Sequence, residues 1–324
     1  MVTTGTHLPS GTVGTSYAQT FSGTGTTTTM STSTTSTTTA IVDLWVHRKT
    51  VKGNIRMSDT SQKDFSEVSD GVLVHKNATL NVDEFSAGKG TVINAHARLT
   101  GTSVKMGREC WIDEYATIGG GSAFDPMAYL NAGDWLHMGN YSQVNIARGV
   151  RVGHEVGVGI GTRIFTHGSY LSEWEGFPVS FDSVSIGARV WLPNAQVNPG
   201  VSIGNDVVVG ANSLVNSDLP DGCLAAGIPA KVIRGGMYPA VLDHERRMHL
   251  LDRLIKDIRE AVGVDVSSSE DFFALKCEDT AFLLSDRVIT GLVSEATESV
   301  RNQLRRHGIR FRFEPWNGEY RQWT

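Results

Sequence analysis

The sequence predicts a mainly β protein, in which a parallel β-solenoid is followed by a small α+β domain. From about residue 72 to residue 236, aliphatic residues recur six positions apart. This period fits neither a helix nor a coiled coil, but it suits a short strand and a turn in every repeat. The chain also contains 35 glycines against 9 prolines, as expected where every repeat needs a tight turn. Stacked turns would bury the repeated aliphatic residues in one continuous column.

The six-residue repeats fall into three blocks. The first block contains Met106, Ile112, Ile118, Phe124, Leu130 and Leu136. After a coil predicted to be irregular near NYSQVN, the second block contains Ile146, Val152, Val158 and Ile164. The third block contains Ile186 and Leu192 and, after a five-residue step at LPNAQ, Val197, Ile203, Val209 and Val215. A chance alternation within an all-β sandwich is the alternative to a solenoid.

Composition divides the rest of the chain. Residues 1–40 contain 17 threonines and no Lys, Arg, Asp or Glu, which predicts a disordered tail, and residues 41–71 form a polar lead-in. Residues 237–324 form the C-terminal domain, with an amphipathic helix over Asp243 to Val262. The strand-like runs DFFALK and TAFLLS, a helix from about Thr290 to Arg306 and the strand IRFRFEP follow that helix.

Charge and cysteine content exclude several classes of protein. A net charge of −5 gives no basic surplus for a nucleic-acid partner. No apolar run is long enough for a membrane-spanning helix, and without a secretory signal the expected location is cytoplasmic. Three cysteines without CxxC spacing predict buried thiols rather than a disulfide framework or a zinc site.

One polar loop interrupts the repeats. It reads TRIFTHGSYLSEWEGFPVSFDSV, and it carries His167. A neutral imidazole is the side chain best suited to accept a proton near neutral pH. His167 is therefore a candidate general base, the alternative being a loop histidine bonded to the backbone.

The coils after this loop resemble a known family. The segments NPGVSIG, VVVGANSLV and GIPAKVIR are similar to the closing coils of hexapeptide-repeat acyltransferases, which include sugar O-acetyltransferases and xenobiotic acetyltransferases. The resemblance implies a left-handed parallel β-helix that forms a homotrimer with sites between subunits. It also implies metal-free transfer of an acyl group from acetyl-CoA to a hydroxyl or amine, with His167 as the general base.

The resemblance also assigns residues to the acyl donor. The backbone around Asn194 is expected at the thioester, where an N–H group would stabilise the oxyanion. Gly210 and Ala211 match the backbone that meets the pantetheine amides, and Lys231 and Arg234 match the basic positions that meet the nucleotide phosphates. No cysteine lies beside a candidate base in the sequence, so a ternary complex is favoured over an acyl-enzyme.

The loop after His167 is longer than in many members of the family. Its residues Tyr170, Glu173, Trp174 and Glu175 are expected to line an acceptor pocket, with Trp174 stacked on a sugar face. Either carboxylate could orient His167. The alternative is a solvated loop without a binding role.

The acceptor and two rival functions stay open. A sugar or glycoside is the expected acceptor, with an antibiotic as the runner-up; O- versus N-acylation and the length of the acyl chain are not settled. A γ-type carbonic anhydrase shares the β-helix and would bind zinc through His137, His154 and His167. A non-catalytic trimeric scaffold is the other rival.

Overall fold

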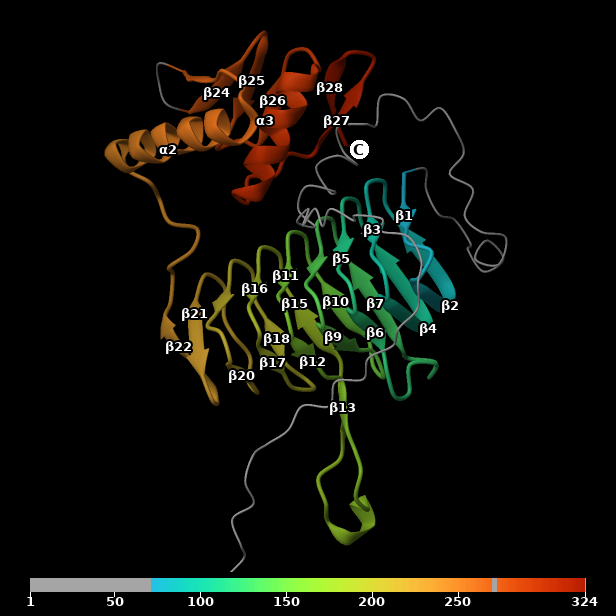
Figure 1. Ribbon diagram of the computed structural model, residues 1–324. Coiled ribbons are helices and arrows are strands. Elements are labelled where there is room, and N and C mark those ends of the chain that lie inside the picture. The colour runs from blue at the N-terminus through green and yellow to red at the C-terminus, as the bar shows by residue number, and fades with distance from the viewer. Residues whose placement is uncertain (1–70, 270–272, 324) are drawn as a thin grey trace, which may run out of the picture. The chain divides into compact units, whose positions relative to one another are not determined.

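The computed structural model describes residues 71–269 and 273–323, which all lie in the compact unit Lys52–Thr324. The tail expected over residues 1–40 lies outside the described residues, and so does the lead-in over 41–71 except for Gly71. The stretch with six-residue repeats forms a stack of parallel strands, as predicted (Figure 1).

The stack has three faces. The first contains β1 (Leu73–Val74), β3 (Val92–Ile93), β5 (Trp111–Ile112), β8 (His137–Met138), β11 (Gly157–Val158), β16 (Trp191–Leu192), β19 (Val208–Val209), β21 (Leu224–Gly227) and, antiparallel at its end, β22 (Ala230–Arg234). The second face begins with the first halves of β2 (Thr79–Ala87) and β4 (Arg98–Met106), and continues with β6 (Thr117–Gly119), β9 (Gln143–Asn145), β12 (Arg163–Ile164), β17 (Gln196–Val197) and β20 (Leu214–Val215). The third begins with the second halves of β2 and β4, and continues with β7 (Tyr129–Ala132), β10 (Val150–Val152), β15 (Val184–Ile186) and β18 (Ser202–Ile203).

Each face contributes one buried column to the core. Ile112 of the first face, Ile118 of the second and Leu130 of the third are all fully buried and belong to one hydrophobic cluster. Parallel pairing keeps these columns in register, because Ile112 pairs with Met138 and Ile118 pairs with Val144. The six-residue period thus reflects one inward side chain on each face of the prism.

Two details of the predicted repeats are wrong. Phe124 is 51% exposed and lies in a loop between β6 and β7 rather than in the core column. The coil at NYSQVN is regular, because Met138 pairs with Val158 and Val144 pairs with Ile164. The irregular segment of this region is therefore the loop before β7.

The C-terminal segment has a hydrophobic core of its own, which contains Leu254 and Phe282. Its elements are α2 (His244–Val262), β23 (Ser267–Ser268), β24 (Ala274–Cys277), β25 (Thr280–Leu283), β26 (Val288–Thr290), α3 (Glu295–Arg306), β27 (Phe313–Trp316) and β28 (Glu319–Gln322). The predicted first helix is confirmed, with Asp243 as its N-cap. The second helix begins at Glu295 instead of Thr290, because Ser294 and Thr297 form a capping box there.

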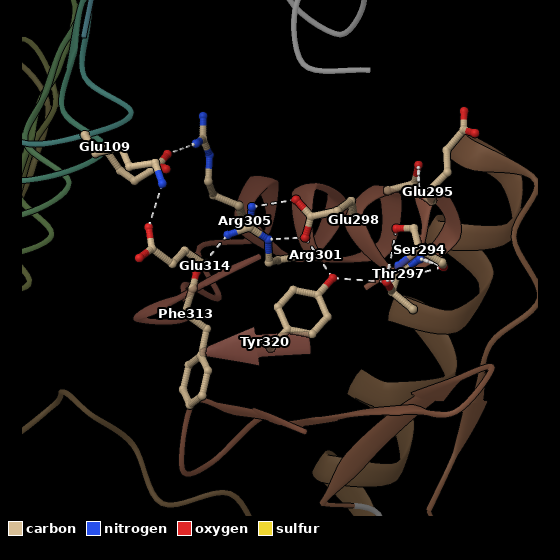
Figure 2. A network of polar contacts seen from close by, with 12 residues as sticks. Glu109, Ser294, Glu295, Thr297, Glu298, Arg301, Arg305, Phe313, Glu314 and Tyr320 are labelled. Atoms are coloured by element: carbon tan, nitrogen blue, oxygen red, sulfur yellow. Dashed lines mark hydrogen bonds and ion pairs between the residues drawn. The ribbon is translucent and has the colours of Figure 1, made fainter. Parts of the chain in front are cut away.

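An arginine whose side chain is 12% exposed connects several elements of this segment (Figure 2). Arg301 of α3 donates to both carboxylate oxygens of Glu298, at 2.9 and 2.7 Å, and to the backbone oxygen of Phe313. The hydroxyl of Tyr320 also donates to Glu298, at 2.7 Å. Burial, together with the charge of Glu298, raises the pKa of Tyr320 above its usual range, so this phenol stays protonated as a donor.

Ion pairs join the C-terminal segment to one corner of the β-helix. Arg305 contacts Glu109 at 2.9 Å, and Glu314 contacts Lys89 at 2.9 Å. Burial alone would oppose ionisation of Glu314. Hydrogen bonds from Lys89 and Arg321, with the charges of Lys89 and Arg108, outweigh burial and hold the pKa of Glu314 below its usual value of 4.5.

Glu314→Gln should therefore destabilise the protein at neutral pH, by roughly 1 kcal/mol. Because the folded-state pKa is depressed, wild-type Glu314 stabilises the fold above its unfolded pKa, and this stabilisation is lost as pH falls through the lower, folded value. Thermal unfolding at neutral pH and at about pH 3 measures the effect. A difference between the two proteins that is equally large at both pH values would contradict it.

Candidate active site

Two loops leave the β-helix at the corner between its second and third faces. The first covers residues 120–128, and the second covers residues 165–183 and contains the predicted base. The second loop begins and ends as a hairpin of β13 (His167–Gly168) and β14 (Ser180–Phe181), which projects from the stack (Figure 1). His167 pairs with Phe181 across this hairpin, and their rings stack at 5.5 Å and 17°. His167 is therefore fixed at the base of the loop, half-buried.

Asn145 determines the orientation of the His167 ring. Its side-chain N–H groups donate to the backbone oxygens of Gly119 and Gly121, at 3.2 and 3.3 Å. The side-chain oxygen of Asn145 must then face His167, whose Nδ1 lies 2.8 Å away. Because that oxygen can only accept, Nδ1 carries the proton in the neutral ring. Nε2 is consequently the nitrogen with a free lone pair, as a general base requires.

A buried threonine and an arginine support this pair. The hydroxyl of Thr166 is fully buried and donates to the side-chain oxygen of Asn145 at 2.7 Å. It also accepts from the backbone N–H of Arg148 at 3.1 Å. The guanidinium of Arg148 lies over the ring of Phe181 and contacts Asp125 of the first loop at 3.2 Å. Both loops are thereby tied to the His167 corner.

Asn145 was missed in the sequence because its partner lies one coil away. The residue that contacts His167 is this amide, 22 positions earlier, rather than Glu173 or Glu175 of the same loop. A polar residue directly after the inward Val144 of a hexad was the available signal. It becomes meaningful only when the coils are stacked.

The four loop residues predicted for the acceptor lie beyond the hairpin. Glu173, Trp174 and Glu175 form a single 3-10 turn without a buried residue. Tyr170 and Trp174 are each 98% exposed. Within one chain they therefore enclose no pocket, and their role in acceptor binding stays a prediction.

Asn194 lies at the corner between the first and second faces. It takes a left-handed backbone conformation with φ of 48°, like Gly161 in the preceding coil. The corner is one residue shorter here, which is the five-residue step seen in the sequence. At this corner the N–H of Tyr141 donates to Glu114 and that of Gly161 to Asn140. The N–H of Asn194, in contrast, has no acceptor among the described residues.

A cavity of about 330 Å³ opens beside Asn194. Its lining includes Gly161, Asn194, Asn212 and Ser213. Asn194 donates from its side chain to that of Asn212 at 2.6 Å, which fixes both amides at the rim. An unpaired N–H beside a cavity of this size is a candidate oxyanion donor.

The other residues predicted to bind the acyl donor lie in the last coils of the β-helix. A Cβ at Gly210 would stand 2.7 Å from that of Ala226, so glycine permits the close approach of these coils. Ala211 follows, exposed, next to Asn212. Lys231 and Arg234 are exposed on β22, where Lys231 pairs with Ala226. Gly210, Ala211 and Lys231 thus lie close to the corner that carries the cavity, whereas Arg234 pairs with Leu224 at the other end of this strand pair.

His167 and Asn194 are not brought together within one chain. Strands β12 and β17 pair in register, and Asn194 precedes the paired segment while His167 follows it. At about 3.3 Å per residue, the width of the face separates the two by roughly 10 to 20 Å. Within one chain, His167 and Asn194 therefore do not face a common site.

The cysteines and histidines bear on the rival mechanisms. Cys110, Cys223 and Cys277 are all buried and free, as predicted. Burial raises the pKa of Cys110 to about 12, which opposes formation of a thiolate nucleophile.

The three histidines of the carbonic anhydrase alternative lie apart. His137 contacts Asp113 and His154 contacts Asp134, while His167 contacts Asn145. Among the described residues, no group of three His, Cys, Asp or Glu side chains could hold a metal ion.

No helix in the described part of the chain is both long and apolar enough to cross a membrane.

Comparison with known proteins gives consistent matches. The family model for bacterial transferase hexapeptide repeats (six repeats) matches residues 183–217. The chain is 31% identical over 141 residues to the galactoside O-acetyltransferase of Escherichia coli (strain K12), covering 39% of this chain and 68% of that protein. It is 35% identical over 111 residues to WbbJ, a putative lipopolysaccharide biosynthesis O-acetyl transferase of the same strain, covering 32% and 57%.

Among solved structures, a mutant of AntD, an N-acyltransferase from Bacillus cereus in complex with dTDP and coenzyme A, is 18% identical. It covers 52% of this chain and 90% of its own, with a TM-score of 0.40.

The parallel β-helix and its sequence relatives define the class of protein as an enzyme that transfers acyl groups. The chain belongs to the hexapeptide-repeat acetyltransferase family, whose β-helix is left-handed. The predicted fold class is thereby confirmed.

Proposed function

We propose that this protein transfers an acetyl group from acetyl-CoA to a hydroxyl or amine of a sugar or glycoside. The observation that carries the proposal is the 2.8 Å contact between His167 Nδ1 and the oxygen of Asn145, which leaves Nε2 free to accept a proton. Two relatives support the acceptor class, since one is named a galactoside O-acetyltransferase and the other is assigned to lipopolysaccharide biosynthesis. A cytoplasmic location is part of the same proposal.

The reaction follows from these groups. Nε2 of His167 takes the proton of the acceptor hydroxyl or amine as the acceptor atom attacks the thioester carbonyl. The N–H of Asn194 stabilises the oxyanion that forms on the carbonyl oxygen. Collapse of this intermediate breaks the carbon–sulfur bond, and the imidazolium returns its proton to the thiolate of CoA. The acetyl group passes directly between substrates, in a ternary complex.

The donor is proposed to lie along the closing coils. The cavity beside Asn194 would receive the thioester end, and the backbone at Gly210 and Ala211 would meet the pantetheine amides. Lys231 and Arg234 are exposed and free to approach the phosphates of the nucleotide. These roles rest on the sequence resemblance and, for Gly210, Ala211 and Lys231, on their position close to the cavity.

A homotrimer is proposed because His167 and Asn194 lie at different corners of one chain. If the His167 corner of one copy meets the Asn194 corner of the next, the base and the oxyanion donor share one site. Three equivalent contacts of this kind close a ring. Light scattering of the purified protein should therefore give three times 35.1 kDa. A monomeric mass for a protein that is active would contradict this arrangement.

The proposed function is tested by release of the CoA thiol. Wild-type protein is incubated with acetyl-CoA and with sugar, amine or antibiotic acceptors, and His167→Ala serves as the control. Thiol release that requires a sugar and depends on His167 supports the proposal. Release only with the antibiotic acceptors would reassign the substrate, and an absence of release with every acceptor would reject acetyl transfer to these classes.

A further inference from the structure

An exposed ladder of aromatic rings runs along the corner between the first and second faces. His96 stacks on Tyr115 at 5.0 Å and 10°, and Tyr115 stacks on Tyr141 at 5.2 Å and 7°. All three residues have φ near 60°, so each occupies the same left-handed corner position in successive coils. Tyr115 is 46% exposed and Tyr141 is 63% exposed. Exposed tyrosines aligned in this way form a surface suited to ring-shaped ligands.

The ladder ends at a glycine. Gly161 occupies the next left-handed corner position, with φ of 67°, and has no side chain to cover the ring of Tyr141. The position beyond it is Asn194. Neighbouring strands are about 4.8 Å apart, so roughly 9 to 10 Å separate the corners at Tyr141 and Asn194. One missing side chain thus leaves a slot that is one coil wide.

The slot has a polar wall opposite the tyrosine. The side-chain oxygen of Asn194 is directed at Gly161, because a Cβ built on Gly161 would lie 3.0 Å from it. Asn194 uses a side-chain N–H to bond Asn212 at 2.6 Å. Its own oxygen and the N–H groups of Asn212 therefore remain available to a ligand. Gly161 also lines the 330 Å³ cavity, so the slot opens into the space beside Asn194.

A pyranose ring matches these walls. One of its faces carries C–H groups, which suit the negative face of an aromatic ring, while its hydroxyls can bond amides. The amides of Asn194 and Asn212 opposite the phenol ring suit the hydroxyls of a sugar. Arg163 lines the adjoining cavity, so the site admits a sugar with or without an anionic group. The backbone corners at Tyr141 and Asn194 are about 9 to 10 Å apart, which leaves room for one pyranose ring stacked on Tyr141, with its hydroxyls toward the side-chain oxygen of Asn194.

We propose that the slot formed by Tyr141, Gly161 and Asn194 binds the pyranose ring of the acceptor, stacked on Tyr141. The position places a bound hydroxyl beside Asn194, where the acetyl thioester is proposed to lie. The inference rests on the proposed function for calling this sugar the acceptor, whereas sugar binding itself can be measured without turnover.

The test measures binding to the full-length protein. Saturation-transfer NMR titrations use the methyl β-pyranosides of galactose, glucose and N-acetylglucosamine, and acetyl-CoA is titrated separately. Tyr141→Ala removes the stacking face, while Tyr141→Phe keeps it. Gly161→Asn fills the slot with a residue that the same corner already accepts at Asn194 and Asn212. Tyr115→Ala is the matched control, because it removes a tyrosine of the same ladder that does not border the slot.

Tyr141→Ala and Gly161→Asn should weaken binding of the best pyranoside about 3- to 10-fold. Tyr141→Ala should leave the Kd of acetyl-CoA within about twofold, because Tyr141 does not line the cavity proposed for the thioester. Tyr141→Phe and Tyr115→Ala should leave the Kd of the sugar within about twofold. Unchanged sugar binding by Tyr141→Ala, or wild-type protein that binds none of the three pyranosides, overturns the inference. A loss confined to acetyl-CoA also overturns it and reassigns the slot to the donor.

Turnover separates this inference from the proposed function. Sugar binding that depends on Tyr141, without any thiol release, would keep the slot and reject the acetyl transfer. Thiol release by Tyr141→Ala with an unchanged acceptor KM would keep the transfer and reject the slot.

Discussion

His167→Ala should lower kcat/KM for acetyl transfer about 10²- to 10⁴-fold, because a positioned general base contributes an effect of that size. The loss should appear in kcat, since Nε2 acts on the proton during attack and not on the binding of acetyl-CoA. The Kd of acetyl-CoA should therefore stay within about twofold of wild type. The fold should tolerate the change, because His167 is half-buried at the base of a projecting loop.

His137→Ala is the matched control for His167→Ala. His137 also lies on the β-helix, but on its first face, where it contacts Asp113 at 3.0 Å. Its removal should leave thiol release near the wild-type rate. Equal activities for the two variants, in thiol-release assays at saturating acetyl-CoA, would reject His167 as the base.

The sequence predicted the core of the β-helix because each inward position requires an aliphatic residue. The prediction that Phe124 belongs to this core was wrong because of the length of one loop. Ile118 and Leu130 are twelve residues apart, which is twice the repeat length, so the inserted loop between them keeps the phase of the hexads. Phe124 falls at the middle of that interval, although it is 51% exposed. A loop with the length of a repeat cannot be seen by periodicity alone.

The error at NYSQVN arose at the corner between the third and first faces. Leu130 on the third face and Met138 on the first are eight residues apart, as are Val150 and Val158. Leu136 lies six after Leu130 and is buried, so it kept the apparent period and hid the longer corner. Only the pairing of the strands shows that Met138, and not Leu136, continues the inward column of the first face.

Only part of the candidate site could likewise be predicted from the sequence. His167 was predictable because it lies in the loop that interrupts the repeat. Its partner Asn145 was not, since the two meet only through the stacking of successive coils. The aromatic ladder has the same origin, because Tyr115 and Tyr141 are 26 residues apart in the sequence and 5.2 Å apart as rings.

Asn145→Ala should lower kcat about 10- to 100-fold, the size of loss seen when the hydrogen-bond partner of a metal-bound histidine is removed. Without the amide oxygen, nothing at that position holds the proton on Nδ1, and the imidazole can present a protonated Nε2 to the acceptor. The KM for acetyl-CoA should not change, because Asn145 lies at the His167 corner and not near the cavity.

Asn198→Ala separates this positioning role from a general effect on the coil. Asn198 directly follows Val197, just as Asn145 follows Val144, and both valines pair with Ile164 from opposite sides. Asn198 accepts from Gln196 and has no contact with His167. Both variants should have a lower free energy of unfolding than wild type. The loss should be about 1 to 3 kcal/mol for the buried Asn145 and smaller for Asn198. Only Asn145→Ala should lose kcat. If both variants lose kcat equally, the effect comes from the coil, and Asn145 does not position the base.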